Sequence, residues 1–286
     1  MRTCTRHKFE GLLLLLAAML AGGPVSAQTT DFSGEWNTLN HEDSDERVPG
    51  PPLGYYLGLP LNEAGRWRAE SNAESIWGLP EFQCRPHPAP YQWRAQGGVQ
   101  FRKEIDPVSR ELTAYHVQYQ RSLDRPIYMD GRPHPSRFAA HSWSGFSTGR
   151  FIGNILEVKT THLKESYFRR NGAPFSDKAT MAEYVIRHGN YLTVMMVLED
   201  PVYLSQPFVQ TTNYQLNLHA QMQFYPCTII DENSSTKNVP HYLPGQNPYL
   251  TEFADAYGIP QEAARGGAET MNPEYRLKIR RPSNLR

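Results

Sequence analysis

MAEYVIRHGNYLTVMMVLED, residues 181–200, alternates apolar and polar side chains on both sides of Gly189-Asn190. Alternation with a period of two is typical of a half-buried strand, and a two-residue Gly-Asn segment between two such runs favours a hairpin. Gly153-Asn154 separates another pair of strand-like runs in the same way. The pattern therefore predicts two antiparallel hairpins, and each turn fixes which residues face each other.

Further strand patterns lie on both sides of these hairpins, at residues 31–36, 99–103, 112–121, 208–216 and 221–225. Together they give about nine strands, mostly joined by short turns. Eight or more strands in such a meander commonly close into a barrel. We therefore expect an all-β fold, an antiparallel meander that closes into a lipocalin-like barrel.

The first residues have the three parts of a secretory signal peptide. Arg2, Arg6 and Lys8 precede an apolar run, and Val25-Ser26-Ala27 fits the small-x-small cleavage pattern. We expect a signal peptide over residues 1–27, a mature chain that begins at Gln28, and a periplasmic or secreted location.

The rest of the chain is expected to form two parts. A barrel-like domain covers residues 28–230 and includes a Pro-rich wrap over residues 40–98. A C-terminal extension covers residues 231–286, with a helix near 248–257 because Asn247-Pro248 suits a helix start and Gly258 suits a helix end.

Two cysteines follow the signal segment, Cys84 and Cys227. An exported chain matures in an oxidising compartment, where two such cysteines usually pair. A metal pair or a catalytic thiol is the alternative, although neither residue has a second cysteine nearby. We expect a disulfide between them.

Strand register brings candidate binding residues to the inner face. In the 189–190 hairpin, Glu183 and Arg187 lie on the same face as Met196 and other apolar residues, and in the 153–154 hairpin Thr160 and His162 lie on the apolar face. Successive antiparallel strands then place His162 near Glu183. A buried carboxylate needs a partner, so this pair is expected to be either a structural ion pair or a functional one.

Several function classes are not favoured. The chain has 29 basic and 29 acidic side chains and no basic run, so we expect no nucleic-acid partner. After signal removal no apolar stretch is long enough for an integral membrane segment. The histidines lack metal-motif spacing, and we expect neither a metal nor another cofactor.

The segment Gly145-Phe146-Ser147-Thr148-Gly149 matches the nucleophile-elbow pattern of serine hydrolases. That elbow needs a helix after the serine. A strand and a hairpin turn follow here instead, so Ser147 is not expected to be a nucleophile.

Two motif regions carry a resemblance: Asp130-Gly131-Arg132-Pro133-His134-Pro135, followed by WSGFSTGR at 143–150, and the region from Thr161-His162-Leu163 to Asp200-Pro201. Over residues 80–230 the chain resembles a family of exported bacterial proteins of unassigned function. The resemblance implies export and a β-rich domain, and it supplies no catalytic residues. Separately, Gly34-Glu35-Trp36 is similar to the Gly-x-Trp that opens lipocalin-type barrels.

These patterns lead to a ranked set of functions. The first is a periplasmic or secreted protein that binds a small, partly apolar ligand in the barrel interior, with His162, Glu183, Arg187, Thr160 and Met196 as ligand-binding candidates. The alternative is an enzyme in which His162 and Glu183 perform acid–base chemistry in that cavity. A further alternative is an envelope structural protein without a cavity.

Overall fold

The computed structural model describes residues 30–47, 49–72, 80–95, 97–119, 123–221, 227–229 and 241–279. They belong to the compact unit Asp31–Arg286, apart from Thr30. The predicted signal peptide and its cleavage site lie outside the described residues, as does nearly all of the strand predicted at 221–225.

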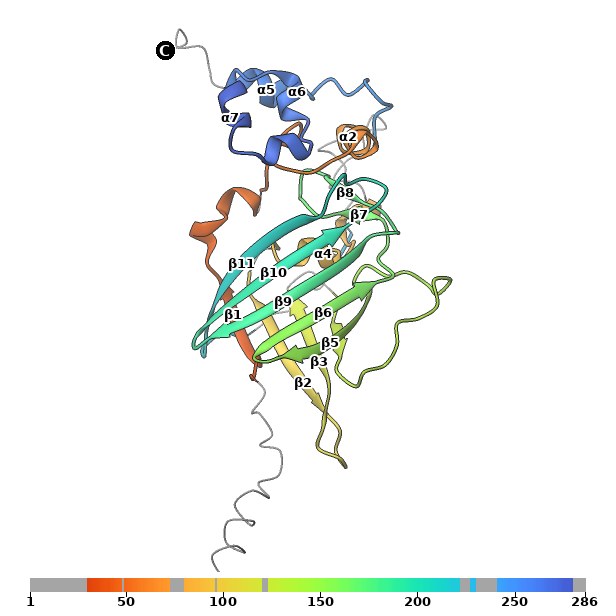
Figure 1. Cartoon of the computed structure of the whole chain (residues 1–286), viewed down its shortest axis with the longest axis vertical. Coiled ribbons are helices and arrows are strands. Elements are labelled where there is room, and N and C mark those ends of the chain that lie inside the picture. Colours follow the sequence, from red (N-terminus) through yellow and green to blue (C-terminus); the bar gives the residue numbers. More distant parts are fainter. Residues whose placement is uncertain are drawn as a thin grey trace, which may run out of the picture. The chain divides into compact units, whose positions relative to one another are not determined.

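Nine strands of the described chain close a barrel, which confirms the predicted all-β fold. Their order around the barrel is β1-β11-β10-β9-β6-β5-β4-β3-β2, and Figure 1 shows β11, β10, β9, β6 and β5 side by side. The strands are β1 (Gly34–Thr38), β2 (Val99–Ile105), β3 (Leu112–Tyr119), β4 (Arg125–Tyr128), β5 (Phe146–Ile152), β6 (Ile155–Thr161), β9 (Thr180–His188), β10 (Tyr191–Glu199) and β11 (Phe208–Leu216).

Both predicted hairpins have the predicted register. In β5–β6, Ser147 faces Thr160 and Gly149 faces Val158. In β9–β10, Met196 faces Glu183. The Gly-Asn turns therefore fixed which side chains of these four strands point inward.

The expectation of a purely antiparallel meander is wrong at one pairing, because β4 and β5 run parallel. The segment 129–145, which contains the DGRPHP motif, separates these two strands. A parallel pair needs a connection of about a dozen residues or more to return to the same end of the sheet, and this segment is long enough to provide it.

Short helices and one small sheet lie outside the barrel strands. The sheet pairs β7 (Ser166–Tyr167) with β8 (Pro174–Phe175). The helices are η1 (Asn40–Glu42), η2 (Ser44–Glu46), α2 (Glu63–Glu70), α3 (Pro80–Gln83), α4 (Ala89–Gln92), α5 (Glu252–Tyr257), α6 (Gln261–Ala264), η4 (Ala268–Met271) and α7 (Tyr275–Lys278).

The C-terminal helix is shorter than predicted. It begins at Glu252, whereas Asn247 closes a turn by accepting a hydrogen bond from the Tyr249 N–H at 3.0 Å. The side-chain amide nitrogen of Asn247 explains the difference, because it donates to the backbone carbonyls of Glu70 and Asn72 and so ties Asn247 to the end of α2. Gly258 ends the helix in the left-handed conformation, as predicted.

The Pro-rich wrap enters the barrel. After α4, the Trp93 ring is 1 % exposed and packs against Phe101, Tyr119 and Tyr214, with ring centroids 5.4–6.4 Å apart. Arg94 fixes this position by donating to the Thr212 hydroxyl at 2.7 Å. The wrap therefore supplies part of the barrel core.

Candidate functional site

Glu183 lies on the inner face of the barrel, as the hairpin register predicts, and its side chain is 0 % exposed. Its partner is Arg125 on β4, which donates through Nη1 at 2.8 Å and through Nη2 to the other carboxylate oxygen. The indole of Trp93 donates to Glu183 at 2.6 Å. The buried carboxylate is thus paired with a residue that the sequence did not point to.

Two further donors of Arg125 also have acceptors. Its Nε donates to the Ser147 hydroxyl at 3.1 Å and its Nη2 to the Thr160 hydroxyl at 2.8 Å. Burial opposes the charge on this guanidinium, but the attraction of Glu183 outweighs burial and raises the pKa of Arg125. The group is therefore a permanently charged, hydrogen-bonded ion pair.

The predicted meeting of His162 and Glu183 is wrong, for two reasons. First, Val158 is the β6 residue that faces Glu183, and four residues of strand separate Val158 from His162 by about 13 Å. Second, β6 ends at Thr161, and His162 adopts a φ of 59°, which breaks the strand alternation. Its Nε2 lies 2.9 Å from the Ser136 carbonyl, on the 129–145 segment.

The other predicted binding residues take separate positions. Thr160 and Met196 are each 1 % exposed and belong to the packed interior around Glu183. Arg187 is half-buried at the far end of β9, where it donates to the Gly189 carbonyl at 2.8 Å and lies 5.2 Å from the Trp36 ring. These residues do not form one open site with His162.

Ser147 lies within β5 and is 1 % exposed. Its hydroxyl contacts Arg125 and lies 3.0 Å from the Thr160 hydroxyl. No sharp turn presents it to solvent, which agrees with the expectation that it is not a nucleophile.

At the level of Glu183, the barrel is filled by side chains. Trp93, Arg125, Tyr119 and Tyr214 are all less than 2 % exposed there. Burial, together with the nearby Tyr214 and Glu183, raises the pKa of Tyr119, so its phenol stays neutral. The interior position proposed for a ligand is therefore occupied by the protein's own core.

A cleft of about 450 Å³ lies outside this core. It is formed by the first part of the wrap, the ends of α2 and α3, and the β7–β8 hairpin. The described residues that line it are Pro49, Gly50, Pro51, Pro52, Leu53, Arg68, Asn72, Phe82, Arg85, Glu165, Ser166, Tyr167, Arg170, Asn171, Gly172, Pro174 and His241.

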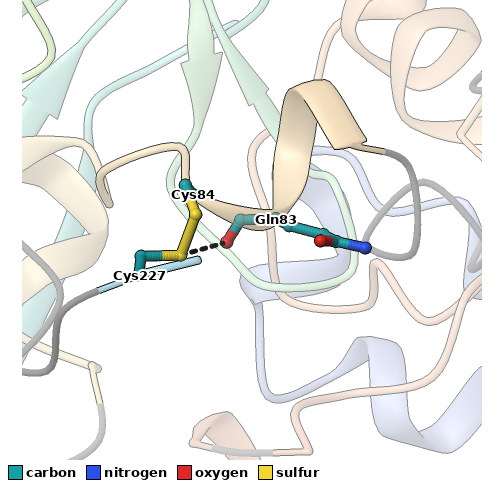
Figure 2. The surroundings of a disulfide bond; sticks show 3 residues. All are labelled: Gln83, Cys84 and Cys227. Atoms are coloured by element: carbon teal, nitrogen blue, oxygen red, sulfur yellow. Dashed lines mark hydrogen bonds between the residues drawn. A yellow bond between two sulfur atoms is a disulfide. The ribbon is translucent and has the colours of Figure 1, made fainter. Parts of the chain in front are cut away.

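One wall of the cleft is held by the predicted disulfide. Cys84 and Cys227 are bonded, with Cα atoms 5.6 Å apart, and the Cys227 sulfur lies 3.6 Å from the Gln83 carbonyl oxygen (Figure 2). The lining residues Phe82 and Arg85 come from the chain next to Cys84. The disulfide therefore anchors the segment that presents these two side chains.

Two arginines of the cleft act on His241, which also lines it. Arg68 lies 3.3 Å from Glu165 and donates to Nδ1 of His241 at 3.3 Å, so the neutral ring accepts at that nitrogen. Burial, then the charges of Arg68 and Arg85, lower the pKa of His241.

Two polar atoms in the cleft walls lack a hydrogen-bond partner among the described residues, the Ser166 hydroxyl oxygen and the Asn171 side-chain carbonyl oxygen. Asn171 is only 8 % exposed, and its amide nitrogen donates to the Tyr55 carbonyl at 2.7 Å. Buried polar atoms usually have a partner in the protein, an ordered water or a ligand.

Metal binding has no candidate group in the described part of the chain, where no three His, Cys, Asp or Glu side chains are placed to hold an ion. Likewise, none of the described helices is long and apolar enough to cross a membrane. No protein-family model, curated protein or solved structure matches this chain.

Proposed function

We propose that this protein is an exported binding protein for a small, partly apolar ligand, and that the ligand binds in the cleft beside the β7–β8 hairpin. The observation that carries the proposal is the cleft itself. Its 450 Å³ and its mixture of proline, aromatic and charged walls suit a small organic molecule. A disulfide-linked chain is compatible with a periplasmic or secreted location.

The arrangement gives less support to the two other functions. An enzyme that uses His162 and Glu183 would need both groups at one point, and the β6–β9 register separates them. The filled interior agrees with a structural protein. However, a protein with only a structural role does not require a cleft with arginines and unpartnered polar atoms in its walls.

Native mass spectrometry of the protein purified from the periplasm tests this proposal. We expect a small-molecule adduct on the wild type, and we expect Phe82→Ala to lose it because an apolar wall is removed. His162→Ala is the control and should retain the adduct.

Two results would contradict the proposal. Wild-type protein without any adduct, after exposure to periplasmic extract, would favour the structural protein. An adduct that survives Phe82→Ala but is lost on Met196→Leu would place the ligand in the barrel interior.

A further inference from the structure

Two histidines share one hydroxyl group on the outside of the barrel. His134 comes from the 129–145 segment and His162 directly follows β6, and the Nδ1 atom of each ring lies 2.7 Å from the Thr161 hydroxyl oxygen. The two nitrogens are therefore at most twice that distance apart. One hydroxyl can donate to one nitrogen and accept from the other, so two neutral rings satisfy this arrangement.

Protonation of both rings makes the arrangement unfavourable. Both Nδ1 atoms then carry a hydrogen, and two positive charges face the same oxygen. Like charges at this distance oppose each other. Burial, followed by His162 and Lys159, already lowers the pKa of His134. His141 adds a third imidazole, whose ring centre lies 5.2 Å from that of His162.

The carboxylates on the elements around the two histidines have other partners. Asp130 on the 129–145 segment accepts from Nε of Arg132 at 2.9 Å. Glu157 on β6 pairs with Arg150 on β5, and Glu165 lies 3.3 Å from Arg68. Protonation of the two rings therefore adds charge beside groups that are positive or already paired. The other charged groups on these elements are Arg137, Lys159 and Lys164.

His162 connects this pair to the cleft through the backbone. Its carbonyl accepts from the Ser142 N–H at 2.9 Å, so it also holds the far end of the 129–145 segment. The chain then runs directly from His162 into Glu165, Ser166 and Tyr167, which line the cleft. A displacement of His162 therefore reaches the 129–145 segment and the cleft wall together.

Trp143 provides a second connection. Its carbonyl accepts from the Ala89 N–H of α4 at 3.0 Å. Its ring lies 5.1 Å from the Arg85 guanidinium carbon and 5.2 Å from the Lys164 ammonium nitrogen. Arg85 lines the cleft. The end of the 129–145 segment thus packs against a cleft residue, on a side chain that directly follows Ser142.

We infer that His134 and His162 form a pH switch for the cleft. With neutral rings, the 129–145 segment and the β7 wall stay in place. With both rings protonated, repulsion displaces His162, loosens the segment and the wall, and releases the small molecule. This inference rests on the proposed function of the cleft as a binding site. Histidine suits such a switch because its charge normally changes near about pH 6.5.

Hydrogen exchange of the mature protein at about pH 7.5 and about pH 5.5 tests the coupling, with rates corrected for the intrinsic effect of pH. Protection of the wild type should fall at least about threefold at the lower pH in peptides from the 129–145 segment and from β7–β8, since one pKa unit of linkage corresponds to a factor of ten. Amides of β10 should not change. Native mass spectrometry at the same two pH values should find less small-molecule adduct in acid.

Variants show whether the two histidines cause the effect. His134→Gln removes one charge of the pair, and His162→Ala removes the other but keeps the backbone bond to Ser142. Each should reduce the loss of protection in acid and retain the adduct at both pH values. The matched control is His188→Gln, which replaces an exposed histidine at the end of β9 and should behave like the wild type. Circular dichroism establishes that each variant is folded.

The outcomes distinguish this inference from the proposed function. If acid loosens only the 129–145 segment and the adduct stays, the cleft binds a ligand and the switch is wrong. The switch is also wrong if both histidine variants respond to acid as the wild type does. If both regions loosen as expected but no adduct is found at either pH, the coupling stands and the binding function fails.

Discussion

Glu183 and Arg125 bury two charges in the centre of the barrel, and their side chains are 0 % and 1 % exposed. Removing a charge from water is unfavourable, and mutual attraction offsets that penalty only when the remaining hydrogen bonds are made. Trp93, Ser147 and Thr160 make those bonds. The ion pair therefore joins the wrap, β4, β5, β6 and β9 at one point, which makes it specific to this arrangement of strands.

Removing one member of this pair should be strongly destabilising. Glu183→Ala leaves a buried guanidinium without a counter-charge, and we expect the free energy of unfolding in urea to fall by about 3–5 kcal/mol. The double variant Arg125→Met, Glu183→Leu should be more stable than Glu183→Ala because no charge remains. Asp177→Ala, which removes the partner of an exposed lysine, should change little. Equal losses for Asp177→Ala and Glu183→Ala would contradict this account.

The burial of Glu183 could be predicted from the sequence, but its partner could not. The Gly-Asn turn sets the register, and the apolar neighbours on the same face identify that face as the inner one. Arg125, in contrast, lies on a four-residue strand with Pro126 in it, and proline argues against a strand in single-sequence reasoning. The sequence also gives no sign of the left-handed backbone of His162, because glycine is the residue usually found in that conformation.

At the scale of elements, a chain of hydrogen bonds attaches the 129–145 segment to the outside of β5 and β6. The Nε2 of His162 donates to the Ser136 carbonyl at 2.9 Å, and its Nδ1 lies 2.7 Å from the Thr161 hydroxyl oxygen. The Thr161 hydroxyl oxygen then accepts a hydrogen bond from Nδ1 of His134 at 2.7 Å. The Thr148 hydroxyl donates to Nε2 of the same His134 ring at 2.9 Å. In this chain Nε2 of His134 accepts a hydrogen bond, which requires a neutral His134 ring.

This chain should make the attachment weaker in acid. Burial, followed by the nearby His162 and Lys159, lowers the pKa of His134 in the folded protein. The unfolded chain then binds protons more readily, so this stabilisation is present above about pH 6.5 and is lost as the pH falls through the lower folded value. Wild-type protein should lose more unfolding free energy than His134→Gln between about pH 7.5 and 5. Equal losses would show that His134 does not contribute to the pH dependence of the unfolding free energy.

The elements differ in how far the sequence reveals them. The sequence predicts local backbone roles for the two Gly-Asn pairs and for Gly258. The structure has hairpin turns at Gly153-Asn154 and Gly189-Asn190, and a helix end at Gly258. The parallel β4–β5 pair and the entry of Trp93 into the barrel depend on contacts between distant segments. No local pattern encodes such contacts, so the sequence could not reveal the cleft outside the barrel.

At the scale of the molecule, three regions distant in sequence form one structure. Arg265 of the C-terminal region pairs with Glu70 of α2, and the Tyr56 N–H donates to the Ala264 carbonyl at 2.8 Å. The disulfide links positions that are 143 residues apart in the sequence. The cleft lies among these regions, because the wrap, α2, α3, the β7–β8 hairpin and His241 all line it.

Loss of the disulfide should therefore affect stability and the cleft together. Cys227→Ser removes a cross-link that closes a very long loop, and we expect the free energy of unfolding to fall by about 2–5 kcal/mol. The barrel should still form, since its strands pair without the disulfide. Phe82 and Arg85 lose their anchor, however, so native mass spectrometry should find less of the small-molecule adduct on the variant than on the wild type, under conditions where circular dichroism shows both to be folded. A variant that is less stable yet retains the full amount of adduct would show that the disulfide stabilises the fold and does not shape the cleft.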